Sequence, residues 1–376
     1  MSPERRILEV LGRSAGGIAR HVARVVEGLG GRDGLRIEVA GPADLPVPMG
    51  APVLEVVIPD GPVRGHPGAI KRLRSIIVGG RYDMVHAHGL RAGIDASLAV
   101  RGRRGGDGAA VPVLVSVHNL MRPDILGGPR ALVYRRAEGL AVRLSDRTFA
   151  PSVEIAEHLR ATVSGAADKI EVLHLGVGAA PLGLHPAGEV RRQLGLGGEE
   201  QLVVTTARLA PQKALDVMLE ALARLPGNVV LAILGDGPLE DELRSHAARL
   251  GVADRARFLG WQDEVAGYVA AADVYCLSSK WEAVALAVQE AVVLGTPVVA
   301  TDVGGMGELI TDRVSGRLVP SGDPSALASA LADVLAFPEE GARYAAAAQD
   351  RLERDFSTEA MLDRLRRAYL GGIDEA

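Results

Sequence analysis

Short apolar runs alternate along the whole chain with longer segments whose apolar residues recur at helical spacing. Apolar runs of this length are typical of strands buried on both faces, and their alternation with helices is typical of a parallel sheet covered by helices. Several runs end in Gly, His or Ser, where a doubly wound sheet places its ligand-binding loops. In the first half we predict strands at 6–11, 35–40, 54–58, 83–87, 112–117, 147–150 and 170–174.

A segment rich in proline and glycine, 177–200, separates this series from a second one of the same kind. The second series ends in a stretch that has a helical pattern almost to the C-terminus. Its predicted strands are 201–206, 228–234, 256–259, 273–278, 297–300 and 316–319, and its clearest helices are 214–225 and 239–250. The pattern therefore predicts an α/β protein with two doubly wound domains.

Length and composition fit two such domains. The chain has 376 residues, of which 48% are hydrophobic and 24% charged, as in ordinary globular proteins large enough for two cores. Its single cysteine, Cys276, excludes an internal disulfide and a cysteine-based zinc site. We predict the domains at 1–178 and 179–356.

No part of the sequence fits a secretion signal or a membrane span. The apolar run Ile7–Leu11 is too short for a signal-peptide core. The longest apolar stretch, 283–300, contains Gln289, Glu290 and Pro297, so we interpret it as a helix followed by a strand. We expect a cytoplasmic protein.

Charge is divided unevenly between the halves. Residues 1–180 hold 24 Lys and Arg against 18 Asp and Glu, a balance of +6, whereas residues 181–376 hold 18 against 29, a balance of −11. The segment 66–81 combines apolar residues at helical spacing with four cations, and Arg101, Arg103 and Arg104 follow it. A solvated helix face is the commonest explanation, and peripheral contact with an anionic membrane stays open. Aromatic residues are only 3%, which argues against nucleic-acid binding.

Two glutamates stand out in the most apolar part of the second half. Glu282 and Glu290 flank the run Ala283-Val284-Ala285-Leu286. Because an unpaired buried charge is costly, a polar group must meet Glu290. In a helix the two carboxylates lie about 12 Å apart along the axis, and a helix start between them offers free N–H groups to phosphate. That spacing is similar to the length of a sugar diphosphate with its ribose.

Arg208 and Lys213 follow the first predicted strand of the second half. Cations at the end of a strand and ahead of a helix can hold a diphosphate and stabilise charge on a leaving group. An isolated pair is more often solvated surface charge. Beside the two glutamates, the phosphate role is favoured.

Glycines and aromatic residues mark other strand ends. Gly16 and Gly17 open a predicted helix, and their spacing does not fit a Gly-x-Gly-x-x-Gly dinucleotide fingerprint, which argues against a dehydrogenase. Gly235 begins a turn in which Asp236 is predicted to cap the next helix. Trp261 has two equally favoured roles, stacking on a nucleobase or packing at the surface.

Histidines end two strands of the first half. His118 follows 112–117, where a structural role and a substrate-binding role are equally open. His86 and His88 end 83–87, and a metal site there is disfavoured because the sequence shows no third ligand.

These segments resemble the Glu-x7-Glu motif and its neighbouring loops in retaining GT-B glycosyltransferases of the family 4 type (group 1). The resemblance is most specific from Thr205 to Glu308. It implies two Rossmann-like domains that face a cleft, with the last helix, 357–376, crossing back onto the first domain. The usual pattern has Gly-Phe after the first glutamate and glycine after the lysine, whereas this chain has Ala283-Val284 and Ala214.

The resemblance also implies a role for each matching residue. Glu290 would bind the ribose hydroxyls, and Glu282 and His118 would lie near the donor sugar. The remaining donor contacts would come from Gly16, Gly17, Arg208, Lys213, Gly235, Trp261, Ala283, Val284, Ala285 and Leu286. Arg208, Lys213, Glu282 and His118 would be the catalytic set, and His86 and His88 would have a structural or acceptor-side role.

The expected function is transfer of a sugar from a UDP- or GDP-sugar to an acceptor hydroxyl with retention of configuration, without a metal or other cofactor. The acceptor class stays open among glycans, lipid-linked molecules and small molecules. Two alternatives also stay open. One is another GT-B enzyme, such as a sugar-nucleotide epimerase or a sugar-phosphate synthase, and the other is a non-catalytic nucleotide-sugar-binding protein.

Overall fold

The computed structural model describes residues 4–13, 17–61, 64–106, 108–118, 128–178, 180, 185–283 and 286–371. The chain forms two compact units, one made of Met1–Gly176 with Thr358–Ala376 and the other of Val177–Ser357. The sequence predicted that the first domain ends at 178 and the second at 356. In the structure the first segment of the first unit ends at 176, and the second unit ends at 357. No helix in the described part of the chain is long and apolar enough to cross a membrane.

The first unit is built on a parallel sheet of order β3-β2-β1-β4-β5-β6-β7. The strand order reverses between β1 and β4, which makes the gap at their carboxyl ends the switch point where such sheets bind ligands. The strands are β1 (Arg5–Leu11), β2 (Leu35–Gly41), β3 (Val53–Glu55), β4 (Met84–His88), β5 (Val113–Ser116), β6 (Arg147–Ala150) and β7 (Ile170–Val172).

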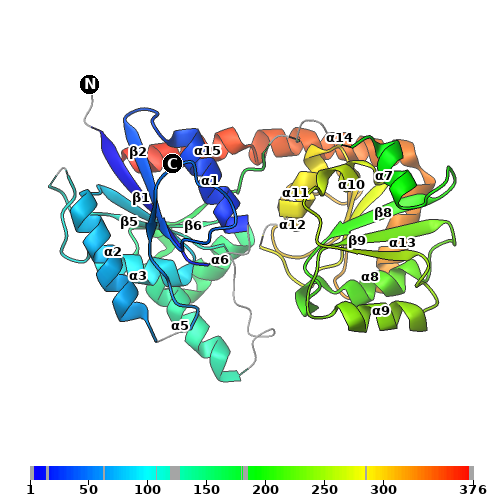
Figure 1. Ribbon diagram of the computed structural model, residues 1–376, viewed down its shortest axis with the longest axis horizontal. Helices are drawn as coiled ribbons and strands as arrows, with labels where there is room; N and C mark the ends of the chain where they lie inside the picture. Colours follow the sequence, from blue (N-terminus) through cyan, green and yellow to red (C-terminus); the bar gives the residue numbers. More distant parts are fainter. Residues whose placement is uncertain are drawn as a thin grey trace. The chain divides into compact units, whose positions relative to one another are not determined.

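Helices cover both faces of this sheet (Figure 1). α2 (His66–Gly80), α3 (Leu90–Val100) and α5 (Gly128–Leu144) pack side by side in that order. α1 (Gly17–Leu29) and α15 (Thr358–Leu370) share another core with β1 and β2. The described part of this unit also contains α6 (Val153–Thr162) and a short 3-10 helix, Ala167–Lys169.

The second unit repeats the plan with a parallel sheet of order β10-β9-β8-β11-β12-β13 and its switch point between β8 and β11. Its strands are β8 (Gln201–Thr206), β9 (Val229–Leu234), β10 (Ala256–Gly260), β11 (Val274–Leu277), β12 (Val298–Thr301) and β13 (Arg317–Val319). Its helices are α7 (Ala187–Gln193), α8 (Leu215–Leu222), α9 (Glu240–Arg249), α10 (Ala266–Ala270), α11 (Leu286–Val293), α12 (Met306–Leu309), α13 (Pro324–Ala336) and α14 (Pro338–Asp355).

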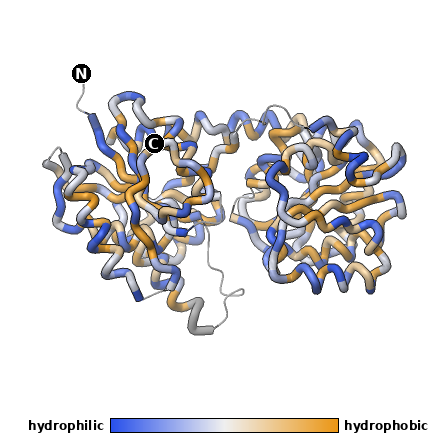
Figure 2. Tube along the Cα trace, viewed as in Figure 1, coloured by the Kyte–Doolittle hydropathy of each residue, from blue (hydrophilic) through white to orange (hydrophobic). Residues whose placement is uncertain are grey.

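The apolar runs of the sequence lie inside each unit, and polar residues lie on its helices and loops (Figure 2). Every predicted strand corresponds to an observed one, from β1 to β13, so the predicted fold class is confirmed. The start of α13 follows the local sequence: the Asp323 side chain accepts from the N–H groups of Ser325 and Ala326, and Pro324 occupies the first turn. The predicted cap by Asp236 is wrong, because α9 starts after Leu239 without a side-chain cap.

The last helix joins the first unit, as expected. Met361, Leu365 and Tyr369 of α15 are buried in the core that α1 shares with β1 and β2. The chain enters α15 in close contact with Gly176, where an added Cβ would lie 2.5 Å from Cα of Thr358 and 2.9 Å from its N. The return of the chain therefore depends on the absence of a side chain at this glycine.

We predict that Gly176→Ala lowers the free energy of unfolding by about 1–3 kcal/mol, because the new methyl group must push backbone rather than a flexible side chain. Urea unfolding measures the change. Gly139→Ala is the matched control, since Gly139 lies in α5 with open space around it and alanine favours a helix. Equal stability of Gly176→Ala and wild type would contradict this account of the packing.

Candidate functional site

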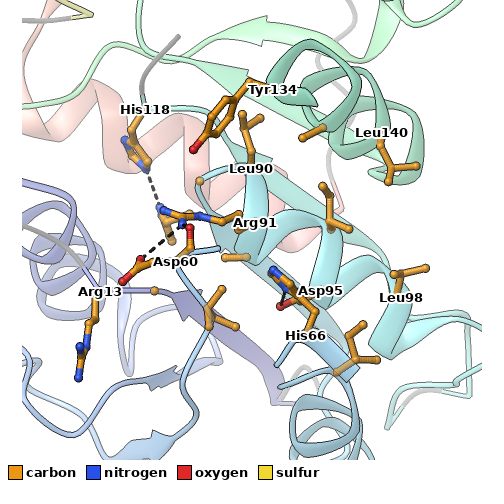
Figure 3. A pocket seen from close by; sticks show the side chains of 18 of the residues that line it. Arg13, Asp60, His66, Leu90, Arg91, Asp95, Leu98, His118, Tyr134 and Leu140 are labelled. Carbon is orange, nitrogen blue, oxygen red and sulfur yellow. Dashed lines mark hydrogen bonds and ion pairs between the residues drawn. The ribbon is translucent and has the colours of Figure 1, made fainter. Parts of the chain in front are cut away.

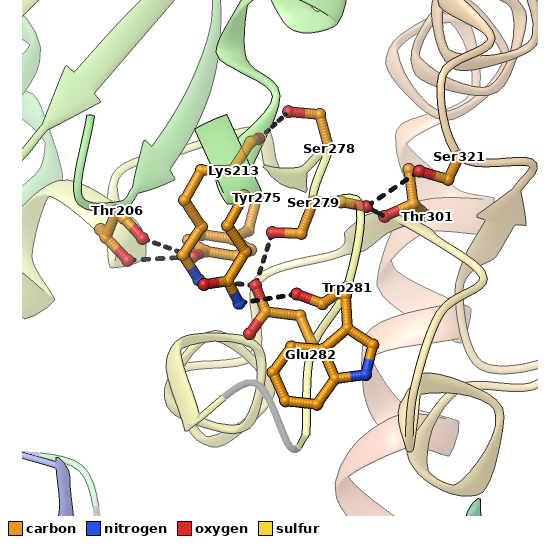
Figure 4. Close-up of polar contacts among 10 residues, drawn as sticks. Thr206, Lys213, Tyr275, Ser278, Ser279, Trp281, Glu282, Thr301 and Ser321 are labelled. Atoms are coloured by element: carbon orange, nitrogen blue, oxygen red, sulfur yellow. Dashed lines mark hydrogen bonds and ion pairs between the residues drawn. The ribbon is translucent and has the colours of Figure 1, made fainter. Parts of the chain in front are cut away.

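The switch point of the second unit brings together a lysine and a glutamate that lie 69 residues apart in the chain. Lys213 Nζ donates to Glu282 Oε1 at 2.5 Å, and the Glu282 side chain is 8% exposed. Lys213 belongs to the loop after β8, and Glu282 to the loop after β11 (Figure 4). The sequence predicted both residues, and the structure shows that they form one ion pair.

Hydroxyl groups and backbone hold this ion pair in place. Ser279 Oγ donates to the same Glu282 oxygen at 2.5 Å, and Ser278 Oγ donates to the Lys213 carbonyl at 2.9 Å. Gln212 Nε2 donates to the Trp281 carbonyl at 2.8 Å. The loops after β8 and β11 are thus joined by several hydrogen bonds as well as by the ion pair (Figure 4).

Glycines allow the neighbouring loops to approach closely. Gly304 has φ +61°, and a Cβ there would lie 1.6 Å from the Glu282 carbonyl oxygen. Gly235 has φ +124°, and a Cβ there would lie 2.2 Å from the Ala207 carbonyl oxygen. At both glycines the backbone conformation and the nearby carbonyl oxygen exclude a side chain. Gly235, which the sequence predicted, thereby allows its loop to pack against Ala207, next to Arg208.

Glu290 lies half-buried on α11, whose first residue is Leu286. Burial, together with the negative charges of Glu290 and Glu282, raises the pKa of the Tyr275 hydroxyl. That hydroxyl is 2.9 Å from Thr206 Oγ1 at the end of β8. Both glutamates therefore act electrostatically on one buried hydroxyl at the switch point.

The other predicted donor residues differ in how the structure places them. Arg208 is exposed next to the Lys213 loop. Trp261 is 73% exposed, and its Nε1 donates to Asp263 Oδ1 at 3.2 Å. Ala283 is buried, and its carbonyl accepts from the N–H of Gly305. The predicted Gly16, Val284 and Ala285 lie outside the described residues.

The remaining two predicted residues, Gly17 and His118, lie in the first unit. Gly17 is the first residue of α1, and His118 follows β5. His118 Nε2 lies 3.1 Å from His88 Nδ1, and the His88 Nε2 atom lies 2.7 Å from Glu9 Oε2. The switch point between β1 and β4 thus contains a chain of buried polar groups.

Sequence reasoning missed three members of this buried cluster, which are Glu9, His21 and Tyr369. Tyr369 of α15 donates its hydroxyl to Glu9 Oε1 at 2.5 Å. His21 of α1 lies with its ring centroid 5.5 Å from that of His88, and neither of its ring nitrogens has a hydrogen-bond partner among the described residues. Glu9 had a visible signal, because it interrupts an apolar strand in the same way as Glu290 interrupts an apolar helix.

Glu9 also completes a group of three possible metal ligands that the sequence did not show. Its carboxylate, His86 and His88 place their possible ligand atoms within 4.8 Å of one another. The contacts of 2.7 Å to His88 and 2.5 Å to Tyr369 are hydrogen-bond lengths. Ligands of a tetrahedral zinc ion, bound at about 2.0–2.1 Å, lie about 3.3 Å apart. The geometry therefore favours hydrogen bonds over a metal.

A pocket of about 620 Å³ opens beside this cluster. Its polar end contains His88 and His118, and from there it continues along α3 between α2 and α5 (Figure 3). The side chains along that path are mostly apolar and include Ile70, Leu98 and Leu140. His66 is a polar exception, since its Nδ1 lies 2.8 Å from both oxygens of the buried Asp95.

Part of the predicted basic surface is engaged within the protein. Arg74 donates to the carbonyls of Leu98 and Ala99 at the end of α3, and Arg72 donates to the Glu55 carbonyl. Arg104 donates to the Gly108 carbonyl. The cations left exposed in the two segments include Lys71, Arg101 and Arg103.

Comparison with known proteins assigns both halves of the chain to glycosyltransferases. Residues 187–351 match the family "Glycosyl transferases group 1", and residues 15–180 match "Glycosyltransferase Family 4". The chain is 36% identical over 180 residues to the lipopolysaccharide core biosynthesis glycosyltransferase LpsE of Rhizobium meliloti, which is 48% of this chain and 52% of LpsE. It is 30% identical to a D-inositol 3-phosphate glycosyltransferase of Thermobispora bispora, over 81% of this chain and 74% of that protein.

A solved structure has the same fold. HepE of Anabaena, crystallised with UDP, superimposes with a TM-score of 0.82 over 97% of this chain and 100% of HepE, at 22% identity. Across LpsE and three further D-inositol 3-phosphate glycosyltransferases, the chain spans only 52% to 65% of the length of the relative.

The buried histidines predict how stability depends on pH. Burial, followed by the charges of neighbouring histidines, lowers the pKa of His21, His88 and His118 below the ordinary 6.5. Below pH 6.5 the unfolded chain therefore binds more protons than the folded one, and the free energy of unfolding falls as the pH falls. Each such histidine contributes up to about 1.4 kcal/mol per pH unit.

We predict that His21→Leu lowers this pH dependence by about 1.4 kcal/mol per unit below pH 6.5, because one of these groups is removed. Urea unfolding at pH 7.5, 6.5 and 5.5 measures the slope. His185→Leu, at an exposed histidine, is the matched control and is expected to keep the wild-type slope. An unchanged slope in His21→Leu would show that this histidine is not held neutral.

Proposed function

Because the chain belongs to the group 1 glycosyl transferases with a family 4 N-terminal half, we propose that it transfers a sugar from a nucleoside diphosphate sugar to an acceptor hydroxyl with retention of configuration. The observation that carries the proposal is the Lys213–Glu282 ion pair at the β8/β11 switch point, one loop before α11. In this proposal the second unit binds the donor and the first unit, which matches the family 4 model, binds the acceptor.

Charge at the switch point supports a diphosphate ligand. Lys213 already has a counter-charge in Glu282, whereas the exposed Arg208 forms no ion pair with any described residue and can meet an incoming diphosphate directly. The diphosphate then shares Lys213 with Glu282, and the start of α11 adds backbone N–H donors. These groups stabilise the departing phosphate without a metal ion. The proposed donor is a UDP- or GDP-sugar, and no cofactor is required.

The proposed reaction takes place on one face of the sugar. The acceptor oxygen forms a bond to the anomeric carbon while the bond from that carbon to the phosphate oxygen breaks, and the departing phosphate takes the acceptor proton. Arg208 and Lys213 stabilise the negative charge on the leaving group, and Glu282 orients the sugar. Glu290 binds the ribose, where a half-buried carboxylate can accept from two hydroxyls.

The pocket of the first unit supports an acceptor with an apolar portion. Its polar end at His88 and His118 suits a hydroxyl-bearing group, and its path along α3 is lined mainly by aliphatic side chains. On α5, Val133 and Leu140 line this path and are 48% and 45% exposed. The proposed acceptor is therefore an amphiphile, such as a lipid-linked or aryl-linked molecule.

The donor assignment is tested by calorimetry with UDP, GDP and ADP, with and without Mg²⁺. We predict that one diphosphate binds without Mg²⁺ and that Glu290→Ala weakens it by about 1–3 kcal/mol, because charge-assisted hydrogen bonds to the ribose are lost. Glu353→Ala, at an exposed glutamate of α14, is the matched control and should bind as wild type. Equal affinity of Glu290→Ala and wild type would remove the ribose assignment.

Turnover distinguishes transfer from the alternatives. With the sugar nucleotide identified, the enzyme should form a glycoside of an amphiphilic acceptor, and Lys213→Ala should lower kcat about 10²-fold or more through lost stabilisation of the leaving group. Binding of the diphosphate without any turnover would instead favour a non-catalytic nucleotide-sugar-binding protein. Turnover of the nucleotide sugar without an acceptor would favour an epimerase.

We also propose that the exposed cations Lys71, Arg101 and Arg103 attract the protein to the anionic face of a membrane that holds such an acceptor. Sedimentation with vesicles that contain anionic lipid should decrease for Lys71→Glu with Arg103→Glu, and should decrease for wild type as salt rises. Equal sedimentation of the variant and wild type would remove this proposal.

A further inference from the structure

A continuous path of hydrogen bonds connects a fully buried carboxylate of the first unit to its pocket. Glu9 is fully buried on β1, and its Oε2 lies 2.7 Å from His88 Nε2 on β4. His88 Nδ1 in turn lies 3.1 Å from Nε2 of His118, which lines the pocket (Figure 3). Both ring nitrogens of His88 therefore take part in the path. His118 takes part through Nε2, and its Nδ1 makes no contact with His88.

The carboxylate decides which of these atoms carry protons. Burial opposes ionisation of Glu9, but the charge of His86 and hydrogen bonds from His86 and His88 outweigh it and hold the pKa of the carboxyl well below its usual range. An ionised carboxylate only accepts, so His88 must donate from Nε2. Burial lowers the pKa of His88 and keeps it neutral, so its Nδ1 has a lone pair.

The same reasoning extends one residue further. Because His88 Nδ1 is an acceptor, His118 must donate to it from Nε2. Burial also lowers the pKa of His118, so its ring is neutral and Nδ1 has a lone pair. A buried negative charge thus sets the tautomer of a histidine two hydrogen bonds away.

We propose that Glu9 and His88 are positioning residues that hold His118 in the Nε2–H tautomer, so that His118 Nδ1 accepts a hydrogen bond from a substrate hydroxyl. The identity of that hydroxyl rests on the proposed function, whereas the tautomer does not. His118 then recognises a hydroxyl as an acceptor and does not donate to it.

The last helix completes the arrangement. Tyr369 donates to Glu9 Oε1 at 2.5 Å and lies 2.6 Å from His86 Nδ1, and His86 Nε2 lies 2.8 Å from Ser116 Oγ. The second carboxylate oxygen is therefore occupied, which directs the first toward His88. His21 packs beside His88 and His118 and adds no hydrogen bond among the described residues.

The test is the tautomeric state of each histidine in the full-length protein, measured by long-range proton–nitrogen NMR correlation at pH 7.5. The expected result for wild type is Nε2–H on both His88 and His118. Protonation of His118 at Nδ1 in wild type would overturn the proposal without any variant.

Glu9→Gln provides the decisive variant, because an amide can donate where a carboxylate cannot. With its oxygen facing Tyr369, the amide donates to His88 Nε2, and the tautomers of His88 and His118 both invert to Nδ1–H. Tyr369→Phe is the matched control, since it removes a buried partner of Glu9 but keeps the acceptor at His88, and no inversion is expected. Inversion in Tyr369→Phe, or none in a folded Glu9→Gln, would overturn the proposal.

Kinetics separate this proposal from the proposed function. In an active transferase, Glu9→Gln should lower kcat at least tenfold while calorimetric affinity for the diphosphate stays unchanged. If wild type shows the expected Nε2–H tautomers of His88 and His118 but has no transferase activity, the positioning of His118 is supported and the proposed function is rejected. The zinc content of the purified protein is also measured. One equivalent of tightly bound zinc, together with a shift of the His86 and His88 NMR signals when zinc is removed, would overturn the proposal, because zinc would then bind the nitrogens that are proposed to carry protons.

Discussion

Parallel strands direct all their carboxyl ends to one edge of a sheet, and this constraint places the chemistry of both units. Where the strand order reverses, the helices on either side leave in opposite directions and the loops between them are not covered. In the first unit this point lies between β1 and β4, and in the second between β8 and β11. The Glu9–His88 contact and the Lys213–Glu282 ion pair lie at these two points.

Each switch point contains a buried carboxylate that accepts from a nitrogen group and from a hydroxyl. Glu282 accepts from Lys213 and Ser279, and Glu9 accepts from His88 and Tyr369. Removing one partner from a buried pair costs about 3–5 kcal/mol, because the other charge is left unpaired. Burying such charges costs desolvation energy even when they are paired, so their presence at a switch point is consistent with a role in binding or orienting a ligand.

One departure from the usual motif, alanine in place of glycine at position 214, has a clear conformational consequence. Ala214 has φ +45° and ψ +46°, a left-handed conformation that costs an alanine about 1–2 kcal/mol and a glycine almost nothing. Its methyl group is buried, which offsets part of that cost. The Lys213 loop therefore has the conformation that the usual glycine would favour, and the substitution leaves the Lys213–Glu282 pair intact.

The sequence by itself determined the two α/β units and every described strand of both sheets, and it named Lys213 and Glu282 as candidate site residues. These features depend on local periodicity and on residues that end a strand, which remain visible in one dimension. Only the tertiary structure decided that Glu9 meets Tyr369, because 360 residues separate them in the chain and no local pattern relates a buried charge to its partner. A carboxylate in an apolar strand can be recognised from the sequence. The group that stabilises it cannot, because that group belongs to whichever helix packs against the strand in the folded protein.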